Sequence, residues 1–421
     1  MTSLSGVLVV FALALQTPAE NATVSQLWPV QKEFLAMPRE VRAGNQLKIA
    51  GNRKEMLRYR TKTAAMPVDF AWTGDGSCVC KLTVRRLPDG KVFHEATVTG
   101  HTAQVVGRLE IGRDWEWTVE TGGEKATGHF KTEDQAPRIL QFDGVANARD
   151  IGGWRGLDGR RVRQGLVFRT GGLNANAKSE YSTYEEILEL FKQGKLEGAG
   201  VGKNAEHLAR EYARNLGQGN GIDRNFLRLI KSGPKEPGKE RLTAADRAWF
   251  LDFAGVRSDI DFREDWETYG MLGSPLGSKV RWFHYPMYSG YHGFVTPVGR
   301  ATQAQAFSVL CGESNYPVVF HCIGGTDRTG TFAYLLGALL GVDEEDLVRD
   351  YEMSFISVGG TDKRHAEWIA GLVKTVRNLP GKTLADKAKG YFLSLGFADE
   401  QIEGVRKRLL EPVCKEEREN R

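Results

Sequence analysis

The chain has 421 residues, of which 41% are hydrophobic and 26% are charged, and this globular composition argues against a largely disordered protein. The length gives room for two domains of ordinary size, or for one domain with large insertions. A formal net charge of +4 gives no support for a nucleic-acid-binding protein, and five cysteines are too few for a disulfide scaffold.

The amino terminus has the pattern of a signal peptide. Gly6 to Leu15 form an apolar run that is too short to span a bilayer, and small residues follow it up to Ala19. No basic residue precedes the run, so a short buried segment or a misassigned start is the alternative. We expect residues 1–19 to be cleaved and the protein to be exported, periplasmic or secreted, with no integral membrane segment in the mature chain.

Residues 28–137 predict an all-β domain. Short runs such as Val68 to Trp72 and Trp115 to Val119 alternate apolar and polar residues, and Pro88 to Gly90 has the composition of a hairpin turn. This pattern, with a closing strand at Gly128 to Thr132, resembles a fibronectin type III or immunoglobulin-like β-sandwich. The resemblance implies a module that binds an unknown protein or glycan; a stabilising appendage without a ligand is the alternative.

Residues 138–421 predict a second domain, in which short apolar strands alternate with helical periodicities as in the α/β class. A polar, glycine-rich insertion at about 173–240 contains two predicted helices and is expected at the domain surface. Within it, Gly198 to Lys203 resembles a nucleotide-binding loop. No apolar strand precedes that loop and no Ser or Thr follows its lysine, so a flexible helix connection is the better interpretation.

The segment from Pro317 to Gly330, PVVFHCIGGTDRTG, carries the strongest chemical signal. An apolar strand leads into a loop with two adjacent glycines and then into an apolar helix. Such a loop turns backbone N–H groups and the positive end of the helix dipole toward one point. The sequence therefore predicts an anion-binding cradle formed by Ile323, Gly324, Gly325 and Thr326. The Gly-Lys-Ser/Thr ending of a nucleotide P-loop is absent.

Cys322 opens this loop and Arg328 closes it, with five residues between them. The sulfur is expected beneath the bound anion, where the planar guanidinium can hold two of the anion's oxygens. The surrounding N–H groups favour the thiolate, which is the nucleophilic form of cysteine. The spacing therefore predicts attack on phosphorus, a phosphocysteine intermediate and its hydrolysis by water, without a metal or a cofactor.

The pattern HC-x5-R followed by TG resembles the cysteine-dependent protein tyrosine phosphatase superfamily. Its form here, HCxxGxDRTG, is similar to atypical bacterial tyrosine phosphatases that also act on phosphoinositides. The resemblance implies a central sheet flanked by helices. A sulfurtransferase is the alternative, because it also uses a loop cysteine, but it would not need the downstream Asp-Arg-Thr-Gly. Further family motifs recur in order between Ile139 and the carboxyl terminus, at Asn147 to Gly153, Gly165 to Gly171, Gly255 to Arg263 and Asp350 to Glu352.

The leaving oxygen needs a proton, so a carboxylic acid is expected near the cradle. Asp327 lies in the loop itself, with stabilisation of the loop as its alternative role. Asp261 ends an apparent strand, where the resemblance supports a catalytic or organising use, and a salt bridge with Arg263 is the alternative. Asp265 is a third candidate that the sequence cannot rank.

Other residues are expected to line or support the cradle. His321 is expected to fix the loop by hydrogen bonding, and Thr329 either donates its hydroxyl to the sulfur or caps the helix. The resemblance implies that Arg149 and Asp150 lie close to the site, with a structural ion pair as the alternative. Arg263 completes the predicted substrate-binding set.

The sequence thus predicts a phosphomonoester hydrolase, foremost a protein tyrosine phosphatase with dual specificity as an option. Its partner would be a phosphorylated protein or a small phosphorylated substrate, and no nucleic acid. An inositol phosphate or phosphoinositide phosphatase is the first alternative, but Thr326 stands where the family usually has a lysine for a multiply phosphorylated substrate. A phosphate-binding module without turnover is the alternative of another class. Redox pairing of Cys311 with Cys322 also stays open.

Overall fold

The computed structural model has a mixed α/β fold and two compact units. The predicted signal peptide and most of the predicted insertion, including both of its helices, lie outside the described residues. The predicted domain boundary at residue 137 stays a prediction. The first unit is Met1–Phe142, Ala146–Arg169 and Phe332–Arg421, and the second is Asp143–Val145 and Thr170–Thr331. The structure describes residues 20–42, 65–73, 77–105, 107–176, 178–179, 234–236, 238–265, 267–268, 270–287, 293–358 and 363–412.

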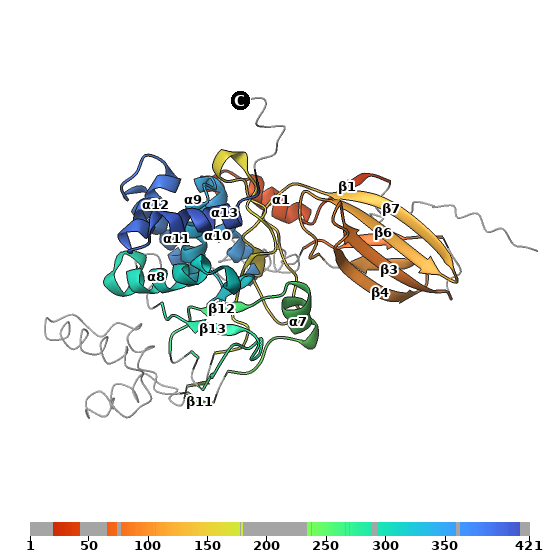
Figure 1. Cartoon of the computed structure of the whole chain (residues 1–421), viewed down its shortest axis with the longest axis horizontal. Helices are drawn as coiled ribbons and strands as arrows, with labels where there is room; N and C mark the ends of the chain where they lie inside the picture. The colour runs from red at the N-terminus through yellow and green to blue at the C-terminus, as the bar shows by residue number, and fades with distance from the viewer. Residues whose placement is uncertain are drawn as a thin grey trace, which may run out of the picture. The chain divides into compact units, whose positions relative to one another are not determined.

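Two β-sheets occupy the amino-terminal part of the first unit. The larger has five strands in the order β1-β7-β6-β3-β4 and is antiparallel except for the β1–β7 pair (Figure 1). The smaller pairs β2 with β5. The turn predicted at Pro88 to Gly90 joins β3 to β4 as expected. The bounds are β1 (Ala22–Val24), β2 (Val68–Ala71), β3 (Val79–Arg86), β4 (Val92–Thr99), β5 (Thr102–Val105), β6 (Asp114–Thr121) and β7 (Glu124–Thr132).

These two sheets share one hydrophobic core, to which Phe70 of β2 and Phe130 of β7 both contribute. Trp115 is fully buried within it, stands edge-on to Phe93 at 4.8 Å between ring centroids, and donates its indole N–H to Thr132 Oγ1 at 3.0 Å. The strands predicted from alternating apolar residues are therefore confirmed, because one side of each strand faces this core.

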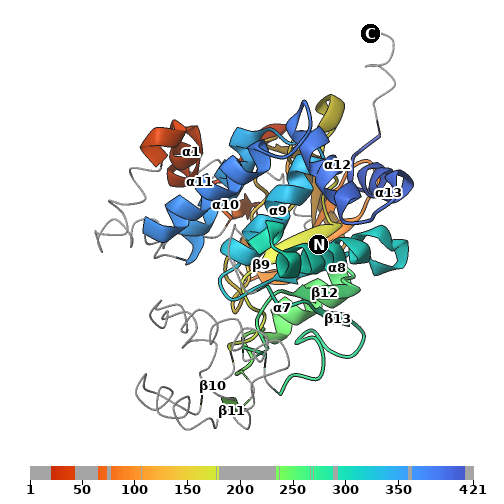
Figure 2. The ribbon, with the colours of Figure 1, turned by 90° about the vertical axis from the view of Figure 1, so that its left-hand side faces the viewer.

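A helix interrupts the segment that the sequence predicted to be all-β. α1 (Pro29–Ala36) begins with a proline at its first turn and lies near α10 (Figure 2). Its Phe34 and Leu35 belong to a hydrophobic cluster with Met353 and Ile356 of α10. The carboxyl-terminal part of this unit is helical, and β8 pairs antiparallel with β9. The bounds are α10 (Glu344–Val358), α11 (Lys363–Arg377), α12 (Leu384–Ser394), α13 (Asp399–Leu409), β8 (Arg149–Asp150), β9 (Val167–Thr170) and a 3-10 turn (Leu157–Gly159).

The second unit contains three parallel strands, with β12 between β13 and β14. Every residue of β12 and β14 is buried, as the apolar run of β14 predicts for a parallel sheet covered on both faces. β10 and β11 pair antiparallel at the two ends of the predicted insertion. The bounds are β10 (Lys178–Ser179), β11 (Pro234–Glu236), β12 (Ser258–Asp261), β13 (Arg281–His284), β14 (Val318–His321), α7 (Ala244–Ala248), α8 (Pro297–Cys311), a π-helical turn (Trp249–Phe253) and 3-10 turns (Gly293–Val295 and Glu313–Asn315).

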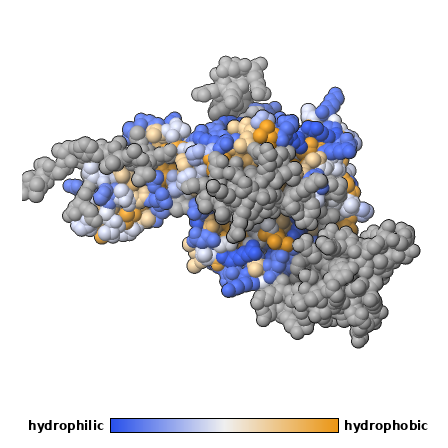
Figure 3. Space-filling model, turned by 180° about the vertical axis from the view of Figure 1, so that it is seen from behind, coloured by the Kyte–Doolittle hydropathy of each residue, from blue (hydrophilic) through white to orange (hydrophobic). Residues whose placement is uncertain are grey.

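α9 (Asp327–Leu339) continues from the second unit into the first. It begins directly after the predicted cradle residues Ile323 to Thr326, as a helix that follows this loop was expected to do. In the view of Figure 3, hydrophilic residues cover much of the described surface and apolar residues lie between them. No helix within the described ranges is long and apolar enough to cross a membrane.

Candidate active site

The loop between β14 and α9 has a shape fixed by close backbone contacts. Gly172 donates its N–H to the carbonyl of Ile323 at 2.9 Å. Gly325 adopts φ +68°, and a Cβ at this position would lie 2.4 Å from the carbonyl oxygen of Thr170. A side chain at Gly325 is therefore excluded both by its backbone conformation and by space.

The residues predicted to form the cradle are mostly buried. Cys322 is 3% exposed and directly follows β14, while Thr326 is 4% exposed and accepts the N–H of Gly330 on its carbonyl at 2.8 Å. Thr329 is fully buried, and its hydroxyl has no hydrogen-bond partner within the described part of the chain. Ile323 and Gly324 are half-buried. The cysteine thus lies at the carboxyl end of β14 and the loop continues into α9, in the order of strand, loop and helix that the sequence predicts.

Arg328 is held by a carboxylate that the sequence analysis did not identify. Its two terminal nitrogens donate to the carboxylate oxygens of Glu267 at 2.6 and 3.2 Å, and one of them also donates to the carbonyl of Phe262 at 3.3 Å. Glu267 is only 2% exposed. Burial alone would lower the pKa of Arg328, but the charges of Glu267 and Cys322 outweigh burial and raise it. Arg328 is therefore a fixed cation beside the cysteine.

We expect Glu267→Gln to lower kcat/KM for phosphate monoesters by about 100-fold. The substitution weakens the contact that positions Arg328, and a displacement of about 1 Å would misalign the guanidinium with the reacting phosphate. Steady-state kinetics on an aryl phosphate measure the effect. Asp252→Asn, which changes an exposed carboxylate in the same unit, is the matched control and should retain parental kinetics. Parental activity in Glu267→Gln would show that Arg328 is held in place by other contacts.

A fully buried charged network lies next to the cysteine. The Nε2 atom of His321 is 3.1 Å from a carboxylate oxygen of Asp259, and its Nδ1 atom is 3.7 Å from Asp261. Arg263 forms hydrogen bonds with both oxygens of Asp261, the shortest at 2.6 Å. The second oxygen of Asp259 accepts the hydroxyl of Ser274 at 2.7 Å. Two aspartates, one histidine and one arginine, all fully buried, therefore pair with one another in this network.

The charge states in this network follow from its neighbours. Burial would raise the pKa of Asp261, but His321 and Arg263 hold it far below its ordinary value. Burial would lower the pKa of His321, but Asp261 and Asp259 raise it instead. The two aspartates therefore favour the imidazolium form of His321, and Asp261 is an ionised partner of Arg263. The salt bridge stated above as the alternative for Asp261 is present.

The predicted residues Arg149 and Asp150 belong to the first unit and are engaged by that unit's own side chains. Arg149 donates to Asp350 at 3.0 Å and also contacts Asn147. Asp150 accepts a hydrogen bond from Arg138 at 2.7 Å and two from backbone N–H groups, of Gly152 and Gly165. Both side chains are almost fully buried, so the structural ion pairs stated as their alternative are present.

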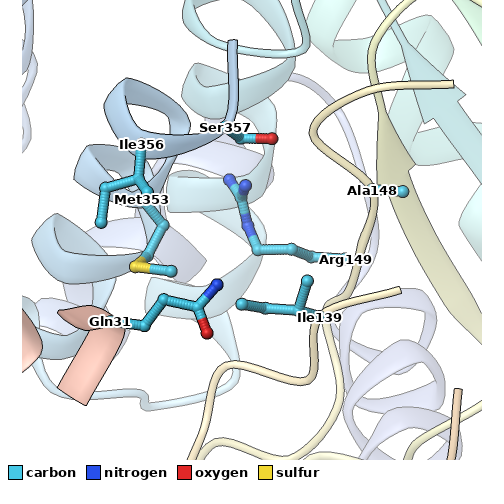
Figure 4. A pocket seen from close by; sticks show the side chains of 7 residues that line it. All are labelled: Gln31, Ile139, Ala148, Arg149, Met353, Ile356 and Ser357. Carbon is cyan, nitrogen blue, oxygen red and sulfur yellow. The ribbon is translucent and has the colours of Figure 1, made fainter. Parts of the chain in front are cut away.

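A small cavity lies beside Arg149, and its size decides whether a ligand fits next to this side chain. Its volume is about 10 Å³, and it is bounded by Gln31 of α1 and by Met353, Ile356 and Ser357 of α10 (Figure 4). This space holds about one water molecule and is too small for a phosphate ester. The role of Arg149 in substrate binding stays a prediction that this cavity does not favour.

The described residues contain no group of three or more His, Cys, Asp or Glu side chains that could hold a metal ion. Neither Cys311 nor Cys322 forms a disulfide in this structure. A strand, a glycine-containing loop with a cysteine and an arginine at its ends, and a helix together define the site as an anion-binding loop of an α/β protein.

Comparison with known proteins identifies the family. The sequence profile described as "Tyrosine phosphatase family" matches residues 140–190 and 238–411, which is more than half of the chain. The chain therefore belongs to the tyrosine phosphatase family, and the superfamily predicted from the Cys322 to Arg328 loop is confirmed. The unmatched residues 191–237 lie inside the segment predicted as an insertion.

Two curated relatives carry matching names. A protein of Cupriavidus necator, named provisionally as a tyrosine-protein phosphatase, is 26% identical over 217 residues, which cover 52% of this chain and 63% of that protein. The tyrosine-protein phosphatase of Nostoc commune is 26% identical over 215 residues, covering 40% of this chain and 71% of the relative. The chain thus spans less than two thirds of the Cupriavidus protein.

Among solved structures, the core catalytic domain of the PP-IP phosphatase SIW14 from S. cerevisiae, in complex with citrate, aligns with 30% of this chain and 74% of its own. The sequence identity is 12% and the TM-score is 0.23. This overlap is too limited to carry an argument about the fold or the substrate.

Proposed function

We propose that this protein is a metal-independent phosphomonoester hydrolase that acts through a phosphocysteine intermediate. The observation that carries the proposal is the buried loop that places Cys322 at the end of β14 and Arg328 at the start of α9, with Arg328 fixed by Glu267 at 2.6 Å. Membership of the tyrosine phosphatase family supports the same chemistry.

The reaction follows from the groups in the loop. The thiolate of Cys322 attacks phosphorus, the S–P bond forms and the P–O bond to the leaving group breaks. Arg328 and the backbone N–H groups stabilise the charge on the equatorial oxygens. The leaving oxygen takes a proton from a carboxylic acid, and that carboxylate then removes a proton from the water that attacks the phosphocysteine. Inorganic phosphate leaves and the thiolate is restored.

Asp327 is our choice for the general acid. It is the first residue of α9 and is half-buried at the loop that holds the phosphate. Asp261 is a poor proton donor, because His321 and Arg263 hold its pKa far below its ordinary value and therefore keep it ionised. Asp265, with a side chain 37% exposed, remains the second candidate.

We expect Asp327→Asn to lower kcat by about 10²- to 10⁴-fold for a substrate with a poor leaving group, such as phenyl phosphate. The loss should shrink when the leaving group is acidic, as in 4-nitrophenyl phosphate, because less proton transfer is then needed. Asp261→Asn should give a loss that is equal for both substrates, since it perturbs the loop rather than proton transfer. A leaving-group dependence in Asp261→Asn and none in Asp327→Asn would reverse the assignment.

The substrate class that we propose is protein phosphotyrosine, with dual specificity as an extension. The two curated relatives are named tyrosine-protein phosphatases, and Thr326 replaces the cationic side chain expected for a multiply phosphorylated ligand. An inositol phosphate or phosphoinositide phosphatase is the alternative. Within the family, we propose that the chain belongs with the atypical bacterial enzymes that its loop HCxxGxDRTG resembles.

The decisive experiment incubates the full chain with phosphotyrosine peptides, phosphoserine peptides, inositol phosphates and phosphoinositide vesicles, in the presence of a metal chelator. We expect release of inorganic phosphate fastest from the tyrosine peptides, and acid quenching should trap phosphate on Cys322. Preference for the inositol compounds would favour the alternative substrate class. An inert protein that still binds phosphate would identify a binding module instead.

We further propose that the protein is exported after removal of residues 1–19 and that its amino-terminal sheets form a fibronectin- or immunoglobulin-like module. The shared core around Trp115 and the hairpin at Pro88 to Gly90 support a sandwich of this kind. The ligand of the module is proposed to be a protein or a glycan. Amino-terminal sequencing of the protein recovered from the cell envelope and medium tests the cleavage.

A further inference from the structure

The turn that carries Glu267 is closed on itself and is attached to the sheet at a few points. The N–H of Glu264 donates to the Glu267 carboxylate at 2.6 Å, and the N–H of Glu267 donates to the carbonyl of Glu264 at 2.9 Å. The carboxylate that holds Arg328 therefore also closes its own turn. A contact that holds the turn between Arg263 and Thr268 in place therefore also holds Arg328 in place, through Glu267.

One histidine makes the attachment on the side of β13. His284 is the last residue of β13 and lies beside Asp261 in the parallel register. Its Nε2 atom is 2.8 Å from the carbonyl oxygen of Arg263 and 3.3 Å from the hydroxyl of Thr268. Since a carbonyl oxygen only accepts, Nε2 carries a proton and donates it there. The histidine thus spans both ends of the turn.

The imidazole ring is itself held in orientation. It stacks on the indole of Trp282 with 5.1 Å between ring centroids and 6° between ring planes, because alternate residues of β13 project to the same side. Its Nδ1 atom faces the carboxylate of Asp265 at 3.9 Å. His284 is only 20% exposed. Stacking and both ring nitrogens therefore direct this side chain at the turn rather than at solvent.

We propose that His284 is a positioning residue: its Nε2–H fixes the Arg263 to Thr268 turn, so that Glu267 holds Arg328 where it can bind a phosphate. Three contacts in series connect the imidazole to the guanidinium, namely His284 to Arg263, the closed turn to Glu267, and Glu267 to Arg328. The effect of His284 on catalysis rests on the proposed function, whereas its effect on phosphate binding does not.

Two variants separate the hydrogen bond from the stacking. His284→Phe keeps a flat ring on Trp282 and removes both nitrogens, whereas His284→Gln loses the ring and keeps an N–H donor at similar reach. We expect His284→Phe to weaken the binding of inorganic phosphate, measured by calorimetry on the full chain, by about tenfold, and to lower kcat/KM for an aryl phosphate similarly. His284→Gln should recover most of both losses. His101→Phe, an exposed histidine outside this unit, is the control.

The proposal is overturned if His284→Phe binds phosphate and turns over substrate as the parent does. It is also overturned if His284→Gln recovers neither property although its melting temperature is unchanged. A double-mutant cycle keeps the test valid if the single variants are unstable. In a Glu267→Gln background, His284→Phe should cost little more, because both act through Arg328; fully additive losses contradict this route. If the parent does not hydrolyse aryl phosphates, the proposed function fails, yet phosphate binding still decides the role of His284.

Discussion

Replacing Cys322 with serine is expected to lower kcat for phosphate monoesters by about 10⁵-fold or more, while substrate still binds. A serine hydroxyl at this position is a much weaker nucleophile than a thiolate, because the hydroxyl stays protonated at neutral pH. The cradle of backbone N–H groups and Arg328 stays intact, so the loss should appear in kcat rather than in KM. Steady-state kinetics with a chelator present, together with capture of a labelled phosphopeptide, measure both parts.

Cys311→Ser is the matched control for this experiment. Cys311 is a half-buried thiol at the end of α8 and should be replaceable without loss of turnover. Undiminished hydrolysis by Cys322→Ser would contradict a phosphocysteine mechanism. Loss of activity in Cys311→Ser as well would instead revive the possibility that the two cysteines act as a redox pair.

The loop itself was predictable because its chemistry is contiguous in sequence. An apolar strand, two glycines and a helix start within one segment give the cradle, and the ends of that segment are Cys322 and Arg328. The structure adds residues from other strands and turns. Glu267, Asp259 and His284 face this region because β12 and β13 pair in a particular register with each other and β12 with β14, and register is not visible in one sequence.

The two aspartates near the cradle illustrate the same limit. Asp261 and Asp327 are equally plausible acids in sequence, because both can lie at the mouth of an α/β site. The structure separates them through burial and partners: Asp261 is fully buried between His321 and Arg263, whereas Asp327 is half-buried at the start of α9. Three acidic residues within four positions, Glu264, Asp265 and Glu267, were the available signal for Glu267, but the sequence does not single out one of these carboxylates.

The fold shows where local pattern was sufficient and where it was not. Alternation of apolar residues predicts β2 and β6 correctly, because each strand packs one side on a core that contains Trp115. The helix α1 was missed, since it is short and its apolar residues could also fit a strand. Its helical form depends on Phe34 and Leu35 packing against Met353, which is more than 300 residues away in sequence.

Asp350→Asn is expected to lower the free energy of unfolding by about 3–5 kcal/mol, because it leaves two buried arginines without their shared carboxylate. Arg149 donates to Asp350 at 3.0 Å and Arg169 contacts its other oxygen. Burial and the neighbouring charge of Arg169 already lower the pKa of Arg149 to about 10. Chemical denaturation measures the loss. Asp346→Asn, a half-buried carboxylate on the same helix that pairs with Arg349, should cost about 1 kcal/mol or less.

The pH dependence of the free energy of unfolding provides an independent check of the contribution of the Asp350 carboxylate. Burial alone would raise the pKa of Asp350, but Arg149 and Arg169 outweigh burial and lower it. The folded state therefore holds the ionised form more tightly than the unfolded state, in which the pKa is about 3.9. The stabilisation is complete above that value and is lost as the pH falls through the lower folded pKa, so the parent and Asp350→Asn should converge in stability toward acid. A double variant, Asp350→Asn with Arg149→Met, should recover part of the loss at neutral pH, because it removes one buried charge; no recovery would show that Arg149 does not need Asp350 as its partner.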